Sequence, residues 1–213
     1  MTKMYSFSNI RFIDLKTLVN IRQVADETVF QGWFQFGYTY HQDEKQFLQE
    51  LIDTNRLYVL SYSEEELKIK FIGPLLNKVH YQFDDVQDWY QRPLKAKINQ
   101  AVLHGYVDFM VAKGVKEPER PYFFIQEFKK TKIDIDPEDQ LLAEMLVAMT
   151  LNPCDRMHGA YIIGQEWRFV ILRRTALNTY EYYVSLIFDC LHFESLCEIY
   201  KNLQAVKSLF CHE

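Results

Sequence analysis

The architecture of this chain follows from two apolar runs, His104-Gly-Tyr-Val-Asp-Phe-Met-Val111 and Tyr122-Phe-Phe-Ile-Gln-Glu-Phe-Lys129. A polar connection that contains Pro118 separates them, which is typical of two strands joined by a turn. Successive side chains of a strand point to opposite faces of the sheet. Glu127 and Lys129 are therefore expected to lie on the same face, one pleat apart.

The two runs also predict which residues face each other. In an antiparallel hairpin whose turn is centred between Glu117 and Pro118, the numbers of facing residues add up to 235, which places Asp108 opposite Glu127. Carboxylates that face each other across a ladder lie about 5 Å apart and repel. Such a pair is costly in a water-poor sheet unless a cation lies between the two groups. We therefore regard Asp108 and Glu127 as candidate metal ligands.

Ordinary structural roles compete with this interpretation. Asp108 could cap a turn or pair with a neighbouring lysine or arginine, and Glu127 with Lys129 could form a solvated ladder on an edge strand. The neighbours of Asp108 make both faces of its strand apolar, and the run from Phe123 to Phe128 is apolar as well. These neighbours favour buried central strands over a solvated edge.

The composition indicates a folded domain in a reducing compartment. The chain has 213 residues, of which 48% are hydrophobic and 15% aromatic, enough for one sizeable core. It contains no run of roughly 20 apolar residues, the length of a membrane span. Its four cysteines form no C-x-x-C pair. We therefore expect a cytoplasmic protein that does not enter the membrane.

Charge is distributed unevenly. The net charge of −5 argues against a protein that coats nucleic acid non-specifically. Residues 92–132, however, carry nine basic side chains against four acidic ones, an excess of five positive charges near Asp108 and Glu127. The basic residues are Arg92, Lys95, Lys97, Lys113, Lys116, Arg120, Lys129, Lys130 and Lys132. This segment could hold a phosphate backbone, or it could be an ordinary solvated face.

The hydrophobic periodicity and the positions of turn and capping residues divide the chain at about residue 60. Residues 1–60 are expected to form a mostly helical extension of unknown role, and residues 61–213 the main domain. Within the main domain, Ser63-Glu-Glu-Glu66 has the pattern of a capping box at the start of a helix. Pro93 is expected to break the region before the two central runs. Asp136-Pro-Glu-Asp139 begins a second helix, and two further hairpin strands, a third strand and a C-terminal helix follow.

This order of elements, and several short motifs, resemble the PD-(D/E)XK nuclease superfamily, particularly the nuclease domain of type I restriction enzyme motor subunits. The resemblance covers about residues 63–190. The motifs that carry it are Glu66-Leu-Lys-Ile-Lys-Phe-Ile-Gly-Pro-Leu-Leu76, Gly105-Tyr-Val-Asp108, Phe124-Ile-Gln-Glu-Phe-Lys129, Gln140 and Gly159-Ala-Tyr-Ile-Ile-Gly-Gln-Glu-Trp-Arg-Phe169. No helicase, methyltransferase or separate DNA-recognition motif accompanies them.

The resemblance implies an α/β domain of the restriction-endonuclease-like fold, with a mixed central sheet flanked by helices. It implies hydrolysis of nucleic acid, with DNA as the favoured substrate and Mg²⁺ or Mn²⁺ as cofactor. Asp108 and Glu127 would bind the metal, and Lys129 would activate water or stabilise charge on the phosphate. A homodimer is one compatible assembly. The alternative is an inactive fold of the same kind that binds nucleic acid or a protein.

The resemblance suggests two further site residues. Glu66 would be an accessory metal ligand, although the capping box with Ser63 explains it equally well. Gln140 would contact the metal shell or a phosphate, and an exposed glutamine in the first turn of a helix is the simpler alternative. Gly-rich phosphate loops and nucleophile elbows are absent from the sequence, which weakens NTPase and hydrolase interpretations.

Overall fold

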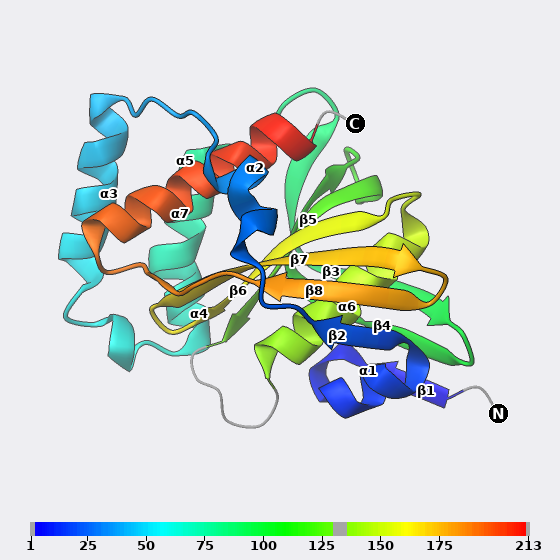
Figure 1. Ribbon diagram of the computed structural model, residues 1–213. Helices are drawn as coiled ribbons and strands as arrows, with labels where there is room; N and C mark the ends of the chain where they lie inside the picture. Colours follow the sequence, from blue (N-terminus) through cyan, green and yellow to red (C-terminus); the bar gives the residue numbers. More distant parts are fainter. Residues whose placement is uncertain (1–2, 130–135, 212–213) are drawn as a thin grey trace.

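The computed structural model describes residues 3–129 and 136–211, which form an α/β fold around one mixed sheet of nine strands (Figure 1). The strand order is β1-β4-β5-β6-β7-β8-β2, with β3 paired to β4 and β9 paired to β7. The strands are β1 (Lys3–Ser6), β2 (Asn20–Gln23), β3 (Val86–Ile98), β4 (Ala101–Lys113), β5 (Glu119–Lys129), β6 (Arg156–Ile163), β7 (Glu166–Ala176), β8 (Thr179–Val184) and β9 (Phe188–Asp189).

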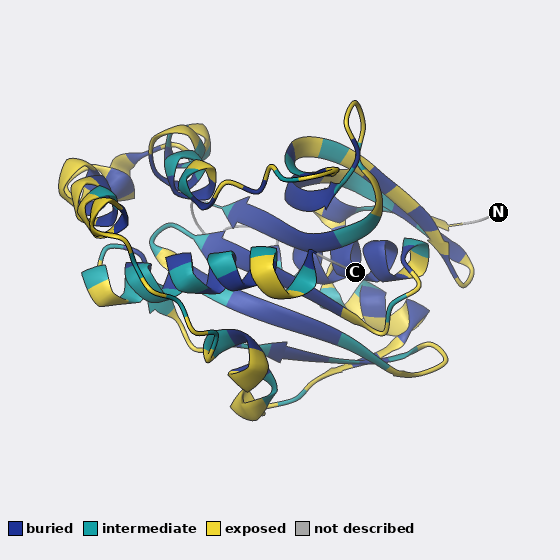
Figure 2. Cartoon of the chain, turned by 90° about the horizontal axis from the view of Figure 1, so that it is seen from above, coloured by how far each residue is buried: buried dark blue, intermediate teal, exposed yellow. Residues whose placement is uncertain are grey.

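Helices cover both faces of the sheet. The α-helices are α1 (Phe12–Leu18), α2 (Gln31–Phe34), α3 (Gln42–Asn55), α4 (Glu64–Leu67), α5 (Gly73–Val79), α6 (Pro137–Leu151) and α7 (Phe193–Ala205). Short 3₁₀ helices are η1 (Phe7–Asn9), η2 (Glu27–Phe30) and η3 (Val59–Ser61), while η4 (Lys68–Ile72) and η5 (Val206–Phe210) are π-helical. One core cluster lies under α2, α3, α5 and α7, and the other lies under α1 and α6. Figure 2 shows the strands buried between these layers.

The element order predicted for the main domain is confirmed apart from the short β9, and the register of its central hairpin is close to the predicted one. Facing pairs of β4 and β5 add up to 235, as in Phe109 with Gln126 and Met110 with Ile125. Irregularities at Ala112 and Lys113 displace the pairing nearer the turn. The register was predictable because a one-residue slip would turn every apolar side chain to the wrong face.

Two sequence expectations differ from the structure. Pro93 does not break the chain, because it lies within β3 and faces Tyr106 of β4. The outer edge of β3 has no strand partner among the described residues, and an edge strand tolerates a residue without an N–H. The segment 1–60 contains the expected helices but also supplies β1 and β2. These strands pair with β4 and β8, so the segment is built into the sheet.

The middle of β4 is the feature that positions the site. One edge of β4 pairs with β3 along nearly its whole length. The opposite edge pairs with β1 as far as His104 and with β5 only from Phe109 onward. We call residues 105–108 of β4 the fork, because β1 and β5 leave this edge unpaired there. The ring of Phe7, just after β1, fills the space above Gly105.

Helix α6 lies so close to the sheet that only glycine fits beneath it at residue 159. A Cβ atom there would lie 2.9 Å from the carbonyl oxygen of Ile125 and 3.1 Å from Sδ of Met145. Gly159→Ala should therefore lower the free energy of unfolding by about 1–3 kcal/mol, because the backbone of β5 and the side chain of Met145 must shift. Urea denaturation measures the change. Gly37→Ala, where a Cβ meets nothing within 4 Å, is the matched control; equal stability of both variants would contradict this packing.

Candidate active site

Asp108 lies in the fork and accepts hydrogen bonds from three directions. The backbone N–H of Phe128 donates to its Oδ2 at 3.0 Å. Lys68 Nζ lies 3.1 Å from Oδ1, which also accepts from the side chain of Gln91. Only 8% of Asp108 is exposed. The aspartate is therefore held at the point where β4 and β5 part, rather than in a solvated turn.

Glu127 is the most deeply buried acid of the predicted set, with an exposure of 0%. Lys129 Nζ lies 2.7 Å from its Oε1, as an ion pair without the geometry of a hydrogen bond. Its Oε2 has no hydrogen-bond partner among the described residues. Burial, and then the nearby charge of Asp108, raise the pKa of Glu127 to about 8. The ion pair with Lys129 therefore offsets only part of the cost of burying this carboxylate beside Asp108.

Lys129 keeps its charge in this position. Burial acts to lower the pKa of its amino group, but the adjacent Glu127 outweighs burial and raises it above the ordinary value. Lys68 behaves alike, since Asp108 and Glu64 outweigh its burial and raise its pKa. The site therefore contains two cations beside two predicted acids.

Gln140 joins the site indirectly through a residue that the sequence interpretation missed. Its amide donates a 3.1 Å hydrogen bond to Glu144 Oε1, one turn further along α6. Glu144 is fully buried, and its Oε2 has no hydrogen-bond partner among the described residues. Burial, and then the charge of Glu127, raise its pKa well above the ordinary value. A lone acid in the apolar run Leu141–Met149 was the sequence signal.

Glu66 is not brought to the other predicted residues. The backbone N–H of Ser63 donates to its Oε2 at 2.9 Å, and Lys70 pairs with its Oε1 at 2.9 Å. These contacts lower the pKa of Glu66 to about 2. Both oxygens of this carboxylate therefore already have partners, and we do not include Glu66 in the proposed metal site. Glu64 approaches the site instead, 2.8 Å from Lys68.

Gln91 and Lys68 also escaped sequence analysis. Gln91 lies in β3 beside Asp108 with a φ of 51°, a left-handed conformation that costs a non-glycine residue about 1–2 kcal/mol. Lys68 begins η4, the π-helical turn that precedes Gly73 and Pro74. Pro74 has no N–H to donate to the preceding turn, which favours the wider helix. Strained residues and π-helical turns both concentrate at functional sites.

The basic segment 92–132 does not form one patch. Lys113 lies five residues along β4 from Asp108, which corresponds to roughly 17 Å. Lys116 and Arg120 lie beyond it, at the turn end of the hairpin. Lys130 and Lys132 are outside the described residues. Lys113, Lys116 and Arg120 therefore lie away from the acids that they were expected to surround, whereas Lys129 pairs with Glu127.

Metal-binding capacity rests on few ligands. Within residues 3–129 and 136–211, no group of three or more His, Cys, Asp or Glu side chains is arranged to hold a metal ion. Asp108 and Glu127 remain as a pair.

No protein-family model matches the chain, and no curated protein is significantly similar to it. Function must therefore be argued from the site. In the described structure, no helix is both long and apolar enough to span a membrane.

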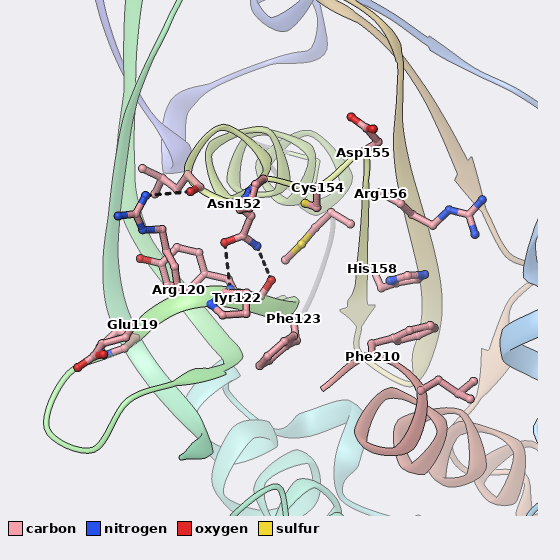
Figure 3. Close-up of a pocket in the computed structure, with 16 residues that line it drawn as sticks. Glu119, Arg120, Tyr122, Phe123, Asn152, Cys154, Asp155, Arg156, His158 and Phe210 are labelled. Atoms are coloured by element: carbon pink, nitrogen blue, oxygen red, sulfur yellow. Dashed lines mark hydrogen bonds between the residues drawn. The ribbon is translucent and has the colours of Figure 1, made fainter. Parts of the chain in front are cut away.

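A cleft of about 1190 Å³ lies at the N-terminal ends of β5 and β6, away from Glu127 and Lys129 at the other end of β5 (Figure 3). The side chain of Asn152 bonds both the backbone N–H and the carbonyl of Tyr122 there, and ties α6 to β5. His158 stacks on Phe210 with ring centroids 3.7 Å apart. Burial, and then Arg156, lower the pKa of His158 to about 3, so it is neutral. This cleft is not lined by any predicted site residue.

Proposed function

We propose that this chain is a metal-dependent nuclease with a restriction-endonuclease-like fold, hydrolysing nucleic-acid phosphodiesters at Asp108, Glu127 and Lys129. The observation that carries the proposal is the buried Glu127 carboxylate, which has an unpartnered oxygen beside a second acid. A buried carboxylate whose charge is only partly offset is rare unless a cation or a chemical role requires it. The mixed sheet with helices on both faces supports the fold assignment.

The residues present fit a hard divalent ion. Asp108 and Glu127 offer carboxylate oxygens, which Mg²⁺ and Mn²⁺ prefer, and Mg²⁺ usually keeps several waters in place of further protein ligands. When bound, such an ion polarises the phosphate and lowers the pKa of the attacking water. Two carboxylates are sufficient for that kind of site, which is consistent with the absence of a larger cluster in the described residues.

The lysine supports a defined chemical role. Because the pKa of Lys129 is raised, the side chain carries a positive charge at neutral pH. It is then suited to stabilise negative charge that develops on the phosphate oxygens, rather than to accept a proton from water. The neighbouring Glu127 holds the ammonium group in place. Lys68 orients Asp108 through an ion pair with its Oδ1.

Cleavage of plasmid and single-stranded DNA in Mn²⁺ tests the proposal. We expect wild type to cut at least one of these substrates, and Asp108→Ala to lose detectable activity. Glu66→Gln is the matched control, because its carboxylate belongs to the capping box, and it should retain the wild-type rate. Equal activity of wild type and Asp108→Ala after rigorous purification would contradict the mechanism.

A second candidate function is a nuclease-like fold that binds nucleic acid or protein without catalysis. The observation in its favour is that Lys68, Gln91 and Phe128 already satisfy Asp108 without an ion. Calorimetric titration with Mn²⁺ discriminates the two functions. Heat of binding that disappears in Asp108→Ala supports the nuclease, whereas no heat at millimolar metal supports the binding module.

A further inference from the structure

A slot of about 450 Å³ opens onto Asp108 from the side of α4 and α5. Its walls are largely apolar, and the polar side chains of Asp108, Lys68 and Gln91 line it as well. Small-molecule sites usually have volumes of about 300–1,000 Å³. The remaining lining comes from Glu65 of α4, the π-helical turn, α5, Tyr90 of β3 and Phe128 of β5.

The apolar residues at the mouth of the slot are unusually exposed. Ile69 is 71% exposed and Tyr90 is 41% exposed. The ring of Tyr90 is held edge-on against Phe109, with centroids 5.2 Å apart, so its position is fixed by the core. Rigid exposed aromatic rings beside a polar floor are a common surface for stacking of unpaired bases.

The acids of the proposed site are recessed rather than raised. Asp108 is 8% exposed and Glu127 is fully buried, so a phosphate must enter the fork to approach them. A regular duplex presents its phosphates on a stiff, convex surface. A single strand can turn one nucleotide inward, with its phosphate toward Asp108 and its base toward Tyr90.

We propose that the slot binds the base of a nucleotide next to the phosphate in the fork, so that the preferred substrate is single-stranded or unpaired nucleic acid. This inference rests on the proposed function. Tyr90 would stack on the base, and Ile69 would pack on its opposite face. Asn77, exposed at the rim, offers an amide to the base edge. Because stacking is available to every base, little sequence preference is expected.

Fluorescence anisotropy tests the slot in EDTA, where cleavage does not interfere. The probes are a labelled oligothymidylate and the duplex that it forms with oligoadenylate. The single strand should bind at least about ten-fold more tightly, and Tyr90→Ala should weaken its binding by about five- to a hundred-fold, as expected for one lost base stack. Tyr90→Phe keeps the ring and should bind like wild type.

Tyr58→Ala is the matched control, because Tyr58 is an exposed tyrosine that does not line the slot. Circular dichroism checks that each variant is folded. Equal affinity for both probes, or unchanged single-strand binding by folded Tyr90→Ala, would overturn the slot proposal even if the protein cleaves DNA. Tyr90-dependent binding without any cleavage in Mn²⁺ would support the slot and refute the nuclease.

Discussion

Glu127→Gln should make the metal-free protein more stable at pH 8, by up to about 5 kcal/mol. Burial and Asp108 raise the pKa of Glu127 to about 8 in the folded state, whereas an unfolded glutamate has a pKa of about 4.3. The folded state therefore binds the proton more tightly, and stability is greatest at low pH. It should fall as the pH rises from about 4.3 to 8. Glutamine cannot ionise and avoids this loss.

Urea denaturation in EDTA between pH 5 and pH 8 measures the effect. Wild type should lose stability across this range, and Glu127→Gln should lose much less. Adding Mn²⁺ at pH 8 should stabilise wild type but not the variant, because only the carboxylate holds the ion. Identical pH profiles for the two proteins would show that Glu127 is ionised without cost, and would remove the main support for a cation.

Lys129→Met should reduce the rate of DNA cleavage in Mn²⁺ by about a hundred- to a thousand-fold. Methionine keeps much of the length of the side chain but removes the charge that we assign to the phosphate oxygens. Loss of one preorganised donor to a developing charge usually costs a factor of this size in kcat. Lys129→Arg should retain part of the activity, because it preserves a cation beside Glu127.

Single-turnover rates of the purified variants provide the measurement. Lys70→Met is the control, since Lys70 pairs with Glu66 on the exposed side of the helix and should not affect the rate. A rate for Lys129→Met within two-fold of wild type would exclude the lysine from the chemistry. Activity of Lys129→Met with a shifted pH optimum would instead assign proton transfer to this residue.

Local sequence pattern was sufficient to predict the register of the central hairpin. The apolar residues of β4 and β5 fix the register, but the pairing begins at Phe109 and Gln126, so Asp108 and Glu127 lie just beyond the paired part. The capping box of Ser63 and Glu66 was equally readable, since its partners are three residues apart. In both cases the interacting residues belong to the same element or to one hairpin.

Distant contacts escaped the sequence interpretation. Lys68 reaches Asp108 across 40 residues, and Glu144 approaches Glu127 only because α6 is enclosed between the sheet and the N-terminal segment. Amphipathic periodicity predicts one buried stripe on a helix, whereas α6 is buried on almost every side. Residues whose burial depends on tertiary enclosure carry no periodic signal.

The length of β1 determines how much of the edge of β4 beside Asp108 is left unpaired. β1 ends at Ser6, opposite His104, and the following η1 turns the chain away over Gly105. Each additional residue of β1 paired along this edge of β4 would cover one more residue of the fork with backbone. A first strand longer by three or four residues would pair with residues 105–108 and cover Asp108. The early end of β1 is thus what leaves this edge of β4 unpaired beside Asp108.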